Sequence, residues 1–233
     1  MKTTAIVLAG GSGSRMKTKT KKQYLLVEGK PVLWYSLHAF EESPLIDAVI
    51  LVCGAGEEAA CREQFVEKFG FRKVEAIVAG GKERYHSVHA GLLAAHGCDL
   101  VLIHDGARPF VDGMMLQRVM DCLATHPACV VGMPVKDTIK IVDDNCYAVS
   151  TPPRSSMWQI QTPQCFITKE IKEAYRKMME AKDDSVTDDG MVMETYGIRG
   201  VRMIKGSYEN IKITTPEDML LGEAILKGRR QSQ

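Results

Sequence analysis

The sequence predicts an α/β fold, a three-layer sandwich in which a Rossmann-like, mostly parallel sheet lies between two layers of helices. Two observations carry this prediction. Short apolar runs without polar alternation recur along the chain, as is typical of strands that are buried on both faces. Amphipathic segments separate these runs, and strands that alternate with helices form parallel sheets. The chain has 233 residues, 45% of them apolar, so we expect a single domain over residues 1–233.

The apolar runs give the expected strands in chain order. The first, Ala5–Ala9, contains no polar residue. Further strands are expected at Ala48–Cys53, Ala76–Ala79, Leu100–Ile103 and Cys129–Met133. The first run is shorter than the apolar core of a signal peptide and far shorter than a membrane span, so no membrane segment is expected.

The amphipathic segments give the expected helices. A helix over 33–40 has Pro31 in its first turn, where the missing N–H of proline does no harm. Helices are also expected at 88–95 and 115–123, whose apolar residues recur at i, i+3, i+4 and i+7. The last helix has marked ends: Thr215 as N-cap, Pro216 at the first helical position, Asp218 three residues after the cap, and Gly228 at the C-terminal end.

Residues 134–164 interrupt this alternation and predict a β-arm that projects from the sheet. A candidate strand, Thr138–Val142, is followed by Asp143-Asp144-Asn145, a second short strand and Thr151-Pro152-Pro153, which is a hairpin pattern. An isolated hairpin is marginally stable in water. Its apolar residues need cover, so we expect a homodimer in which two arms embrace about a two-fold axis. An ordinary long loop is the alternative. The apolar residues in question are Ile139, Ile141, Val149 and Trp158.

Charge and cysteine content exclude several classes of protein. The chain carries 30 basic and 29 acidic residues, a net charge of +1, so neither a nucleic-acid partner nor a membrane surface is expected. Seven cysteines occur without a C-x-x-C pair or zinc-site spacing. This pattern indicates reduced thiols and a cytoplasmic protein.

The segment 8–16, LAGGSGSRM, follows the first strand and has the composition of a phosphate-binding loop. Met16 breaks the dinucleotide fingerprint, and no Gly-Lys-Ser/Thr ends a Walker loop. Arg15 and Lys22 remain as two cations beside the glycines, which suits phosphoryl or nucleotidyl transfer. A solvated basic loop is the alternative.

Two further segments carry polar residues at strand ends. Gly80–Ser87 links a strand to a helix, and backbone N–H groups at a helix start favour an anionic or hydrogen-bonding ligand. Asp105 comes just past the carboxyl end of a buried strand, the edge at which open α/β sheets bind ligands. A carboxylate there can hold Mg²⁺ or a ribose hydroxyl. Alternatively, Asp105 and Arg108 form a structural ion pair.

Two segments near the C-terminus have ordinary structural interpretations. Thr187-Asp188-Asp189 is typical of an N-cap with an acidic first turn. Asn210–Thr214 predicts an edge strand.

The pattern L-A-G-G-x-G-x-R-M followed by Lys22-Gln23-Tyr24 resembles the signature of sugar-phosphate nucleotidyltransferases. More narrowly, it is similar to the 2-C-methyl-D-erythritol 4-phosphate cytidylyltransferase family of the non-mevalonate isoprenoid pathway. G-G-x-x-R-x-x-S at 80–87 and H-D-x-A-R-P at 104–109 match as well, and the motifs run in order from Ala9 to Asp218. The resemblance implies a fold of the nucleotide-diphospho-sugar transferase type and a homodimer. It also implies formation of 4-diphosphocytidyl-2-C-methyl-D-erythritol and pyrophosphate from CTP and the polyol phosphate.

The resemblance implies roles for individual residues. Arg15 and Lys22 are the catalytic cations at the attacked α-phosphate, and Asp105 is the residue that holds Mg²⁺. The nucleotide-binding residues are Ala9, Gly10, Gly11, Gly13, Gly81, Ser87, Asp105 and Gly106. The substrate-binding residues are Arg108, Thr138, Arg154, Thr187 and Lys212. This chain departs from the family pattern at Lys21, where proline is usual, at Lys82, where an acidic residue is usual, and at Gly106, where alanine is usual.

Other functions stay open at this point. A ribitol-5-phosphate cytidylyltransferase shares most of these motifs. At the position of Gly106-Ala107, however, the ribitol enzymes are expected to carry two bulkier residues. A molybdopterin-type nucleotidyltransferase has a similar glycine loop, but should lack K-Q-Y and H-D-x-A-R-P. A catalytically inactive nucleotide-binding regulatory module is the remaining alternative, and joint retention of Arg15, Lys22 and Asp105 argues against it.

Overall fold

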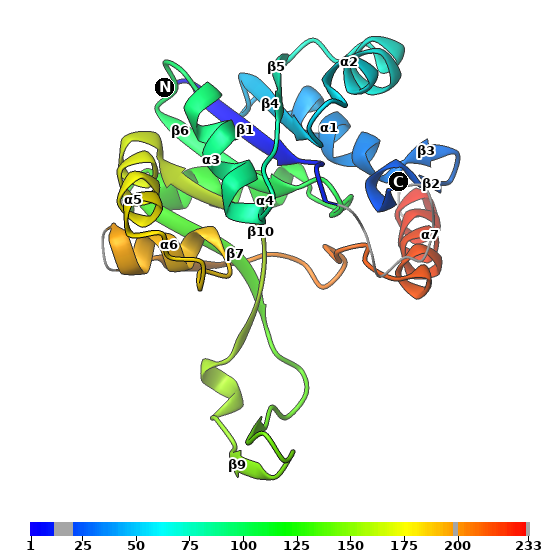
Figure 1. Cartoon of the computed structure of the whole chain (residues 1–233). Helices are drawn as coiled ribbons and strands as arrows, with labels where there is room; N and C mark the ends of the chain where they lie inside the picture. Colours follow the sequence, from blue (N-terminus) through cyan, green and yellow to red (C-terminus); the bar gives the residue numbers. More distant parts are fainter. Residues whose placement is uncertain (12–20, 198–199, 232–233) are drawn as a thin grey trace.

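A computed structural model describes residues 1–11, 21–197 and 200–231. Its main sheet has the strand order β11-β7-β10-β6-β1-β4-β5 (Figure 1). Every neighbouring pair in it is parallel except that β10 runs antiparallel to β6 and β7. The mostly parallel sheet is confirmed, and each of the five strands predicted from the apolar runs overlaps an observed one. The strands are β1 (Thr3–Leu8), β4 (Ala48–Cys53), β5 (Val74–Ala79), β6 (Leu100–Asp105), β7 (Ala128–Pro134), β10 (Trp158–Ile167) and β11 (Arg202–Lys205).

Helices cover both faces of the sheet, which confirms the three layers (Figure 1). On one face, Ala5 and Val7 of β1 pack in a core with α1 (Val32–Glu42) and α4 (Gly113–Leu123). Ile6, between them, points to the other face. This alternation of side chains is the strand period of two. The second face is covered by α3 (Arg84–Ala94), α5 (Thr168–Ala181) and α6 (Asp189–Tyr196).

Smaller elements flank these layers. The helix α2 (Glu58–Cys61) continues into a π-helical segment, η3 (Arg62–Glu67), which packs on the α1 side of the sheet. Strands β2 (Leu26–Val27) and β3 (Lys30–Pro31) form a separate ribbon. Pro31 therefore ends β3 and is the N-cap residue of α1 rather than part of its first turn.

The last helix, α7 (Pro216–Gln231), begins as expected but ends later. The Asp218 carboxylate accepts hydrogen bonds from the backbone N of Thr214 and of Thr215, both at 2.8 Å. An acidic side chain three residues after the N-cap is expected to accept from the N-cap backbone in this way. The prediction that Gly228 ends the helix is wrong. Gly228 has no positive φ, the conformation through which glycine ends helices, so the helix passes through it.

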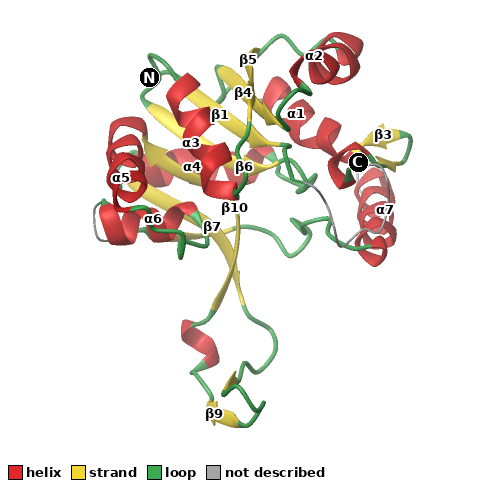
Figure 2. Ribbon diagram, in the orientation of Figure 1, coloured by secondary structure: helices red, strands yellow, loops and turns green. Residues whose placement is uncertain are grey.

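The predicted β-arm projects from the sheet as a hairpin below the body of the molecule (Figure 2). It contains β8 (Ile141–Val142), β9 (Ala148–Ser150) and the 3₁₀ turn η4 (Arg154–Ser156). The strand predicted at Thr138–Val142 is reduced to its last two residues. The expected range 134–164 is also too long, because β10 already pairs with β7 from Trp158 onward. The arm proper therefore spans 135–157.

Two local predictions near the C-terminus are wrong. Asn210–Thr214 is not an edge strand. Its backbone makes one hydrogen bond to the loop after β6, from Ile213 N to Ala107 O at 2.8 Å, and it forms no strand ladder. The N-cap of α6 is Asp188, not Thr187, because the Asp188 carboxylate accepts from Met191 N at 2.8 Å. In the described part of the chain, no helix is long and apolar enough to cross a membrane.

Candidate active site

Two adjoining cavities open at the carboxyl ends of the parallel strands. The first has a volume of about 300 Å³ and the second about 290 Å³. Arg84, Asp105 and Lys212 line both cavities and so form the wall between them. Ligands in the two cavities would therefore meet at this charged wall.

The glycine-rich loop after β1 closes one side of the first cavity. Gly10 and Gly11 line the cavity. A Cβ on Gly10 would lie 3.2 Å from Cys53 O, so the loop passes close to the end of β4. The amide of Gln23, itself buried, donates to Ala9 O and, at 3.2 Å, to Gly11 O. This side chain holds residues 9–11 in place.

The loop between β5 and α3 closes the opposite side. The Ser87 hydroxyl accepts a hydrogen bond from Gly81 N at 3.2 Å and donates to Glu83 O at 3.3 Å. A Cβ on Gly80 would lie 2.6 Å from that hydroxyl oxygen, so the close approach requires glycine. Ser87 thus shapes the loop as well as lining the cavity.

Asp105, at the end of β6, is the electrostatic centre of the shared wall. Its carboxylate accepts from Lys212 Nζ at 2.6 Å and from Arg84 Nε at 3.4 Å, and its side chain is only 11% exposed. Burial alone would raise the pKa of Asp105, but the charges of Arg84 and Lys212 outweigh it and lower the pKa well below the usual range. The carboxylate therefore stays ionised under all physiological conditions.

The orientation of Arg84 is fixed by the fully buried carboxylate of Asp189, which lines neither cavity. Its guanidinium donates to both oxygens of Asp189, at 3.0 and 2.7 Å, in a bidentate pair. Tyr175 also donates to Asp189, at 2.6 Å. Burial lowers the pKa of Arg84, but Asp189 and Asp105 outweigh it and raise the pKa well above its usual value. Arg84 therefore presents a permanent, oriented positive charge to both cavities.

A chain of hydrogen bonds lies behind Asp105. Asp105 N donates to Thr162 Oγ1 at 3.0 Å, and Thr162 Oγ1 lies 3.0 Å from His104 Nδ1. The other ring nitrogen, Nε2, lies 3.0 Å from Arg108 O, which can only accept. The proton of the neutral ring must then sit on Nε2, so that Nδ1 accepts from the Thr162 hydroxyl. His104 lines neither cavity, and burial lowers its pKa to about 4.

The second cavity is lined by Arg108, Thr187 and residues of β10. The β7–β10 ladder is interrupted between Ile160 and Gln164, and the residues in this interruption turn toward the cavity. Arg108 donates to Asn210 O at 2.8 Å and to Ile160 O at 3.3 Å, while its buried Nε has no partner among the described residues. Burial lowers the pKa of Arg108, because it disfavours the charged guanidinium. An anion in this cavity would offset that cost and could accept a hydrogen bond from the guanidinium.

Comparison with known proteins identifies the family. Residues 3–228 match the 2-C-methyl-D-erythritol 4-phosphate cytidylyltransferase family. The chain belongs to this family. Enzymes of that name from Alkaliphilus oremlandii and Lachnospira eligens are 45% and 47% identical to it, over 100% and 97% of this chain and 98% and 99% of theirs. The crystal structure of 4-diphosphocytidyl-2C-methyl-D-erythritol synthase from Anaerococcus prevotii superposes with a TM-score of 0.85, at 35% identity, over 97% of this chain and 96% of that one.

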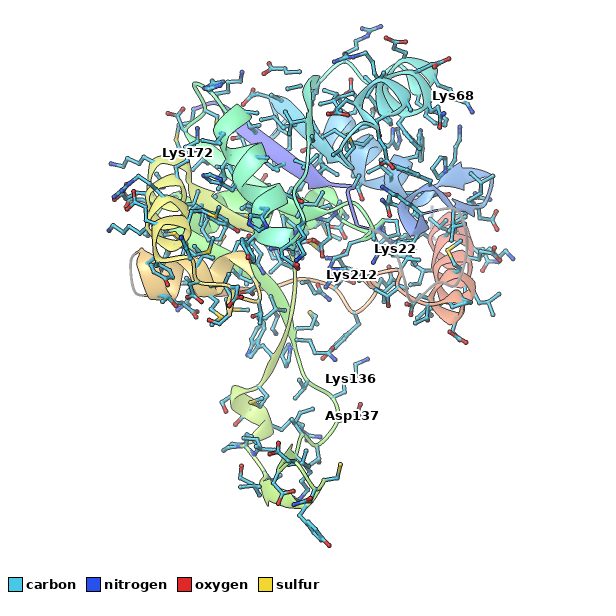
Figure 3. All side chains as sticks on the ribbon, viewed as in Figure 1. Lys22, Lys68, Lys136, Asp137, Lys172 and Lys212 are labelled. Carbon is cyan, nitrogen blue, oxygen red and sulfur yellow. The ribbon has the colours of Figure 1, made fainter. Side chains whose placement is uncertain are left out.

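The structure brings most of the predicted site residues of this family together. Seven line the first cavity: Gly10, Gly11, Lys22, Gly81, Ser87, Asp105 and Lys212. Figure 3 shows Lys22 and Lys212 together at this edge of the body. Ala9 lies directly behind the loop, buried and bonded to Val52 O. Arg108 and Thr187 line the second cavity, which Asp105 and Lys212 also reach.

The remaining predicted residues lie elsewhere. Gly106 lies under the site, where a Cβ would be 2.8 Å from Leu33 Cδ1, so the family's usual alanine would not fit without movement. Thr138 and Arg154 are on the exposed arm and line neither cavity. Gly13 and Arg15 are outside the described residues. The alternative of an Asp105–Arg108 ion pair is not what forms, because Asp105 pairs with Arg84 and Lys212.

Sequence reasoning assigned no role to several residues of the site, among them Arg84 and Gln23. Arg84 stands inside the G-G-x-x-R-x-x-S motif, which could have identified it. Gln23 stands inside K-Q-Y, which could have identified it in the same way. The partners that fix the site, Asp189 and Thr162, lie 105 and 57 residues from the groups they hold, and no local signal predicts these pairings.

The residues present fit one kind of metal site. Among the described residues, no group of three His, Cys, Asp or Glu side chains could enclose a metal ion. Asp105 is the ionised carboxylate at the wall between the cavities. Mg²⁺ is commonly held by one or two carboxylates together with substrate phosphates. This donor set suits an ion that arrives with a nucleotide.

Proposed function

We propose that this chain transfers the cytidylyl group of CTP to 2-C-methyl-D-erythritol 4-phosphate, forming 4-diphosphocytidyl-2-C-methyl-D-erythritol and pyrophosphate. Family membership over nearly the whole chain supports the reaction. The observation that carries the assignment of the site is the shared wall of Arg84, Asp105 and Lys212 between two cavities. CTP in the first cavity and the polyol phosphate in the second would bring their phosphates together there.

The reaction needs no general base. The attacking phosphate monoester has a second pKa of about 6 and is largely dianionic at pH 7, so its oxygen can attack the α-phosphorus of CTP directly. Accordingly, both ring nitrogens of the buried His104 are hydrogen-bonded within the protein, and the ring lines neither cavity. Catalysis then consists of bringing two anions together and stabilising the charge that develops on the α-phosphate.

Cations of the chain provide this stabilisation. Lys22 lines the nucleotide cavity, and Arg15 follows the glycines of the same loop in the sequence. We assign both to the α-phosphate in the transition state. Lys212 and Arg84 stand at the wall, and their pairing with Asp105 keeps them oriented without an occupant. Such preorganised donors do not have to reorganise as the reaction proceeds.

Asp105 is proposed to hold Mg²⁺ together with the phosphates of CTP. Bound there, the ion would neutralise charge on the phosphates and orient them for in-line attack. The chain's own contribution is the ionised carboxylate at the end of β6, held by Thr162 and the two flanking cations.

Selection of cytosine is assigned to backbone groups of the loop Ala9–Gly11 and of Gly81; Gly10 and Gly11 line the first cavity on one side and Gly81 on the other. A site built on hydrogen bonds rejects bases with the wrong donor pattern, because its polar groups are then left unpaired, by about 10⁴-fold or more. We therefore expect CTP to be used far better than ATP or GTP. Lys82, a departure from the family pattern, also lines this cavity. Of the other nucleotides, we expect UTP to be rejected least.

A homodimer is proposed to complete the second cavity. Ile141, Tyr147 and Val149 on the arm are 51%, 74% and 65% exposed, which supports cover by another chain. The arm projects away from the body that contains both cavities (Figure 2), and Lys136 and Asp137 lie at its start (Figure 3). Thr138 and Arg154 would then bind the polyol phosphate of the partner subunit's site. All seven cysteines are free, which supports a cytoplasmic location.

One assay separates this function from the alternatives. The protein is incubated with CTP and Mg²⁺ together with either 2-C-methyl-D-erythritol 4-phosphate or ribitol 5-phosphate, and pyrophosphate is measured. We expect release with the first acceptor only. Faster release with ribitol 5-phosphate would assign the chain to the ribitol enzymes. No release with either acceptor, from protein that binds CTP, would make it a regulatory module.

A further inference from the structure

The turn that carries Lys22 is held from outside the cavity. Lys22 opens the short 3₁₀ turn η2 (Lys22–Tyr24), with Tyr24 N donating to Lys21 O at 2.9 Å. Lys22 and Gln23 line the first cavity. Lys21 and Tyr24, on either side of them, line neither cavity and bond to a different part of the protein.

Both of these flanking residues bond to one carboxylate, that of Glu57. Lys21 Nζ lies 2.6 Å from Glu57 Oε1, and Tyr24 Oη donates to Glu57 Oε2 at 3.3 Å. The side chains of Lys21 and Glu57 are 25% and 32% exposed, so solvent screens the pair only in part. The hydrogen bond from Lys21 is the largest cause that lowers the pKa of Glu57, so the carboxylate is ionised at neutral pH. Glu57 therefore spans the turn with both oxygens.

Glu57 is itself firmly placed. It precedes α2, and its backbone N donates to Gly54 O at 3.0 Å. The ion pair lies directly over Gly54, where a Cβ would be 2.6 Å from Lys21 Nζ and 2.8 Å from Glu57 Oε2. Tyr24 also stacks on Phe65, with ring centroids 4.6 Å apart. The anchor of the turn is thus tied to the end of β4 and to α2.

Lys21 has φ −60° and ψ 139°. This φ is the value that a proline ring enforces, about −65°. In lysine no ring enforces this φ, and the ion pair with Glu57 is the contact that its side chain makes.

We propose that Glu57 is a positioning residue for the reaction: by holding Lys21 and Tyr24 with its two oxygens, it fixes the backbone from which Lys22 reaches the α-phosphate. This inference rests on the proposed function. It adds a residue outside both cavities and outside every motif of the sequence. Because Glu57 acts through the placement of Lys22, it should affect turnover more than CTP binding.

The test compares matched variants by steady-state kinetics. We expect Glu57→Ala to lower kcat about 10- to 100-fold, the range for a displaced catalytic group, with a much smaller change in KM for CTP. Glu58→Ala removes the next carboxylate along the chain, which has no ion-pair partner among the described residues, and should leave kcat unchanged. Gly54→Ala keeps both charges but displaces the pair, and should lower kcat in the same way as Glu57→Ala.

A rescue variant separates positioning from general destabilisation. In Lys21→Pro/Glu57→Ala the ring enforces the φ that the ion pair no longer holds, so kcat should recover most of the loss. Urea unfolding of each variant checks that the protein is folded. Unchanged kcat in Glu57→Ala, an equal loss in Glu58→Ala, or no recovery in the double variant would overturn the proposal.

Hydrogen exchange provides a readout that does not depend on activity. The amides of Tyr24 and Leu25 bond to Lys21 O and Lys22 O, so Glu57→Ala should speed deuterium uptake in a peptide spanning 21–25 relative to Glu58→Ala. Equal uptake in the two variants would overturn the inference. Failure of wild-type protein to release pyrophosphate would instead overturn the proposed function, and leave this comparison intact.

Discussion

His104 makes the stability of this protein sensitive to mild acid. The ring is fully buried, donates from Nε2 to Arg108 O and accepts at Nδ1 from Thr162. A second proton would have to go on Nδ1, where it would face the hydroxyl hydrogen of Thr162 and leave that hydrogen without its acceptor. Burial is the largest cause of the low pKa, about 4 against an ordinary 6.5.

The size and sign of the effect follow from this shift. Between pH 6.5 and 4 the unfolded chain binds a proton at His104 that the folded chain does not, so folding stability falls as pH falls through this window. With these two pKa values, the loss between pH 7 and pH 5 is about 2 kcal/mol. The depressed pKa of Asp105 acts in the same direction, but only near and below its ordinary value of 3.8, outside this interval.

Urea unfolding at pH 7 and at pH 5 measures the loss. We compare wild type with His104→Gln, which cannot titrate, and with His96→Gln, which removes an exposed histidine in the loop after α3. His104→Gln should be less stable at pH 7 but should lose about 2 kcal/mol less than wild type on going to pH 5. His96→Gln should keep the wild-type loss. An equal loss in wild type and His104→Gln would refute the reasoning about this ring.

Three other predictions concern the reaction. Arg15→Ala and Lys22→Ala should each lower turnover by about 10²–10³ with a smaller effect on CTP binding; a folded variant with near wild-type turnover would remove its residue from the transition state. Pyrophosphate release should stop in excess chelator and return with Mg²⁺, and Asp105→Asn should need more Mg²⁺; full activity in chelator would contradict a metal-assisted reaction. Mixing Arg154→Ala with Lys22→Ala should restore up to about a quarter of the wild-type activity, since half of the dimers are mixed and each holds one intact site. A mixture that stays inactive despite subunit exchange would show that the arm does not cross.

Local patterns in the sequence predict five of the parallel strands, β1, β4, β5, β6 and β7, but not β11, which pairs with β7 at the edge of the sheet. The run Ala48–Cys53 is apolar throughout and is a fully buried strand with the predicted bounds. The glycines at 10–11 and 80–81 follow such runs, so their place at the carboxyl edge was predictable too. These features depend on side-chain period and turn chemistry, which act over a few residues.

Helix ends and strand partners were less predictable. The sequence predicts Thr187 as the N-cap of α6, but Asp188 is the N-cap, because either of two adjacent polar residues can serve and the tertiary structure selects one. The sequence pattern places part of the ten-residue strand β10 in the arm. Its pattern does not say that it inserts, antiparallel, between β6 and β7. Strand order is decided by which faces become buried, and that depends on the whole sheet.

The sequence by itself determined the fold class, the arm and the chemistry of the glycine-rich loops, because each is written in contiguous residues. Only the tertiary structure decided how the charges are arranged. Asp105 is paired with Lys212, 107 residues away, and Arg84 with Asp189, 105 residues away. Glu57, 36 residues beyond Lys21, lies in no sequence motif, yet it bonds to Lys21 and Tyr24 on both sides of Lys22. Such pairs depend on Coulomb interactions in partly buried sites, whose strength is set by distance and desolvation, and both exist only after the chain has folded.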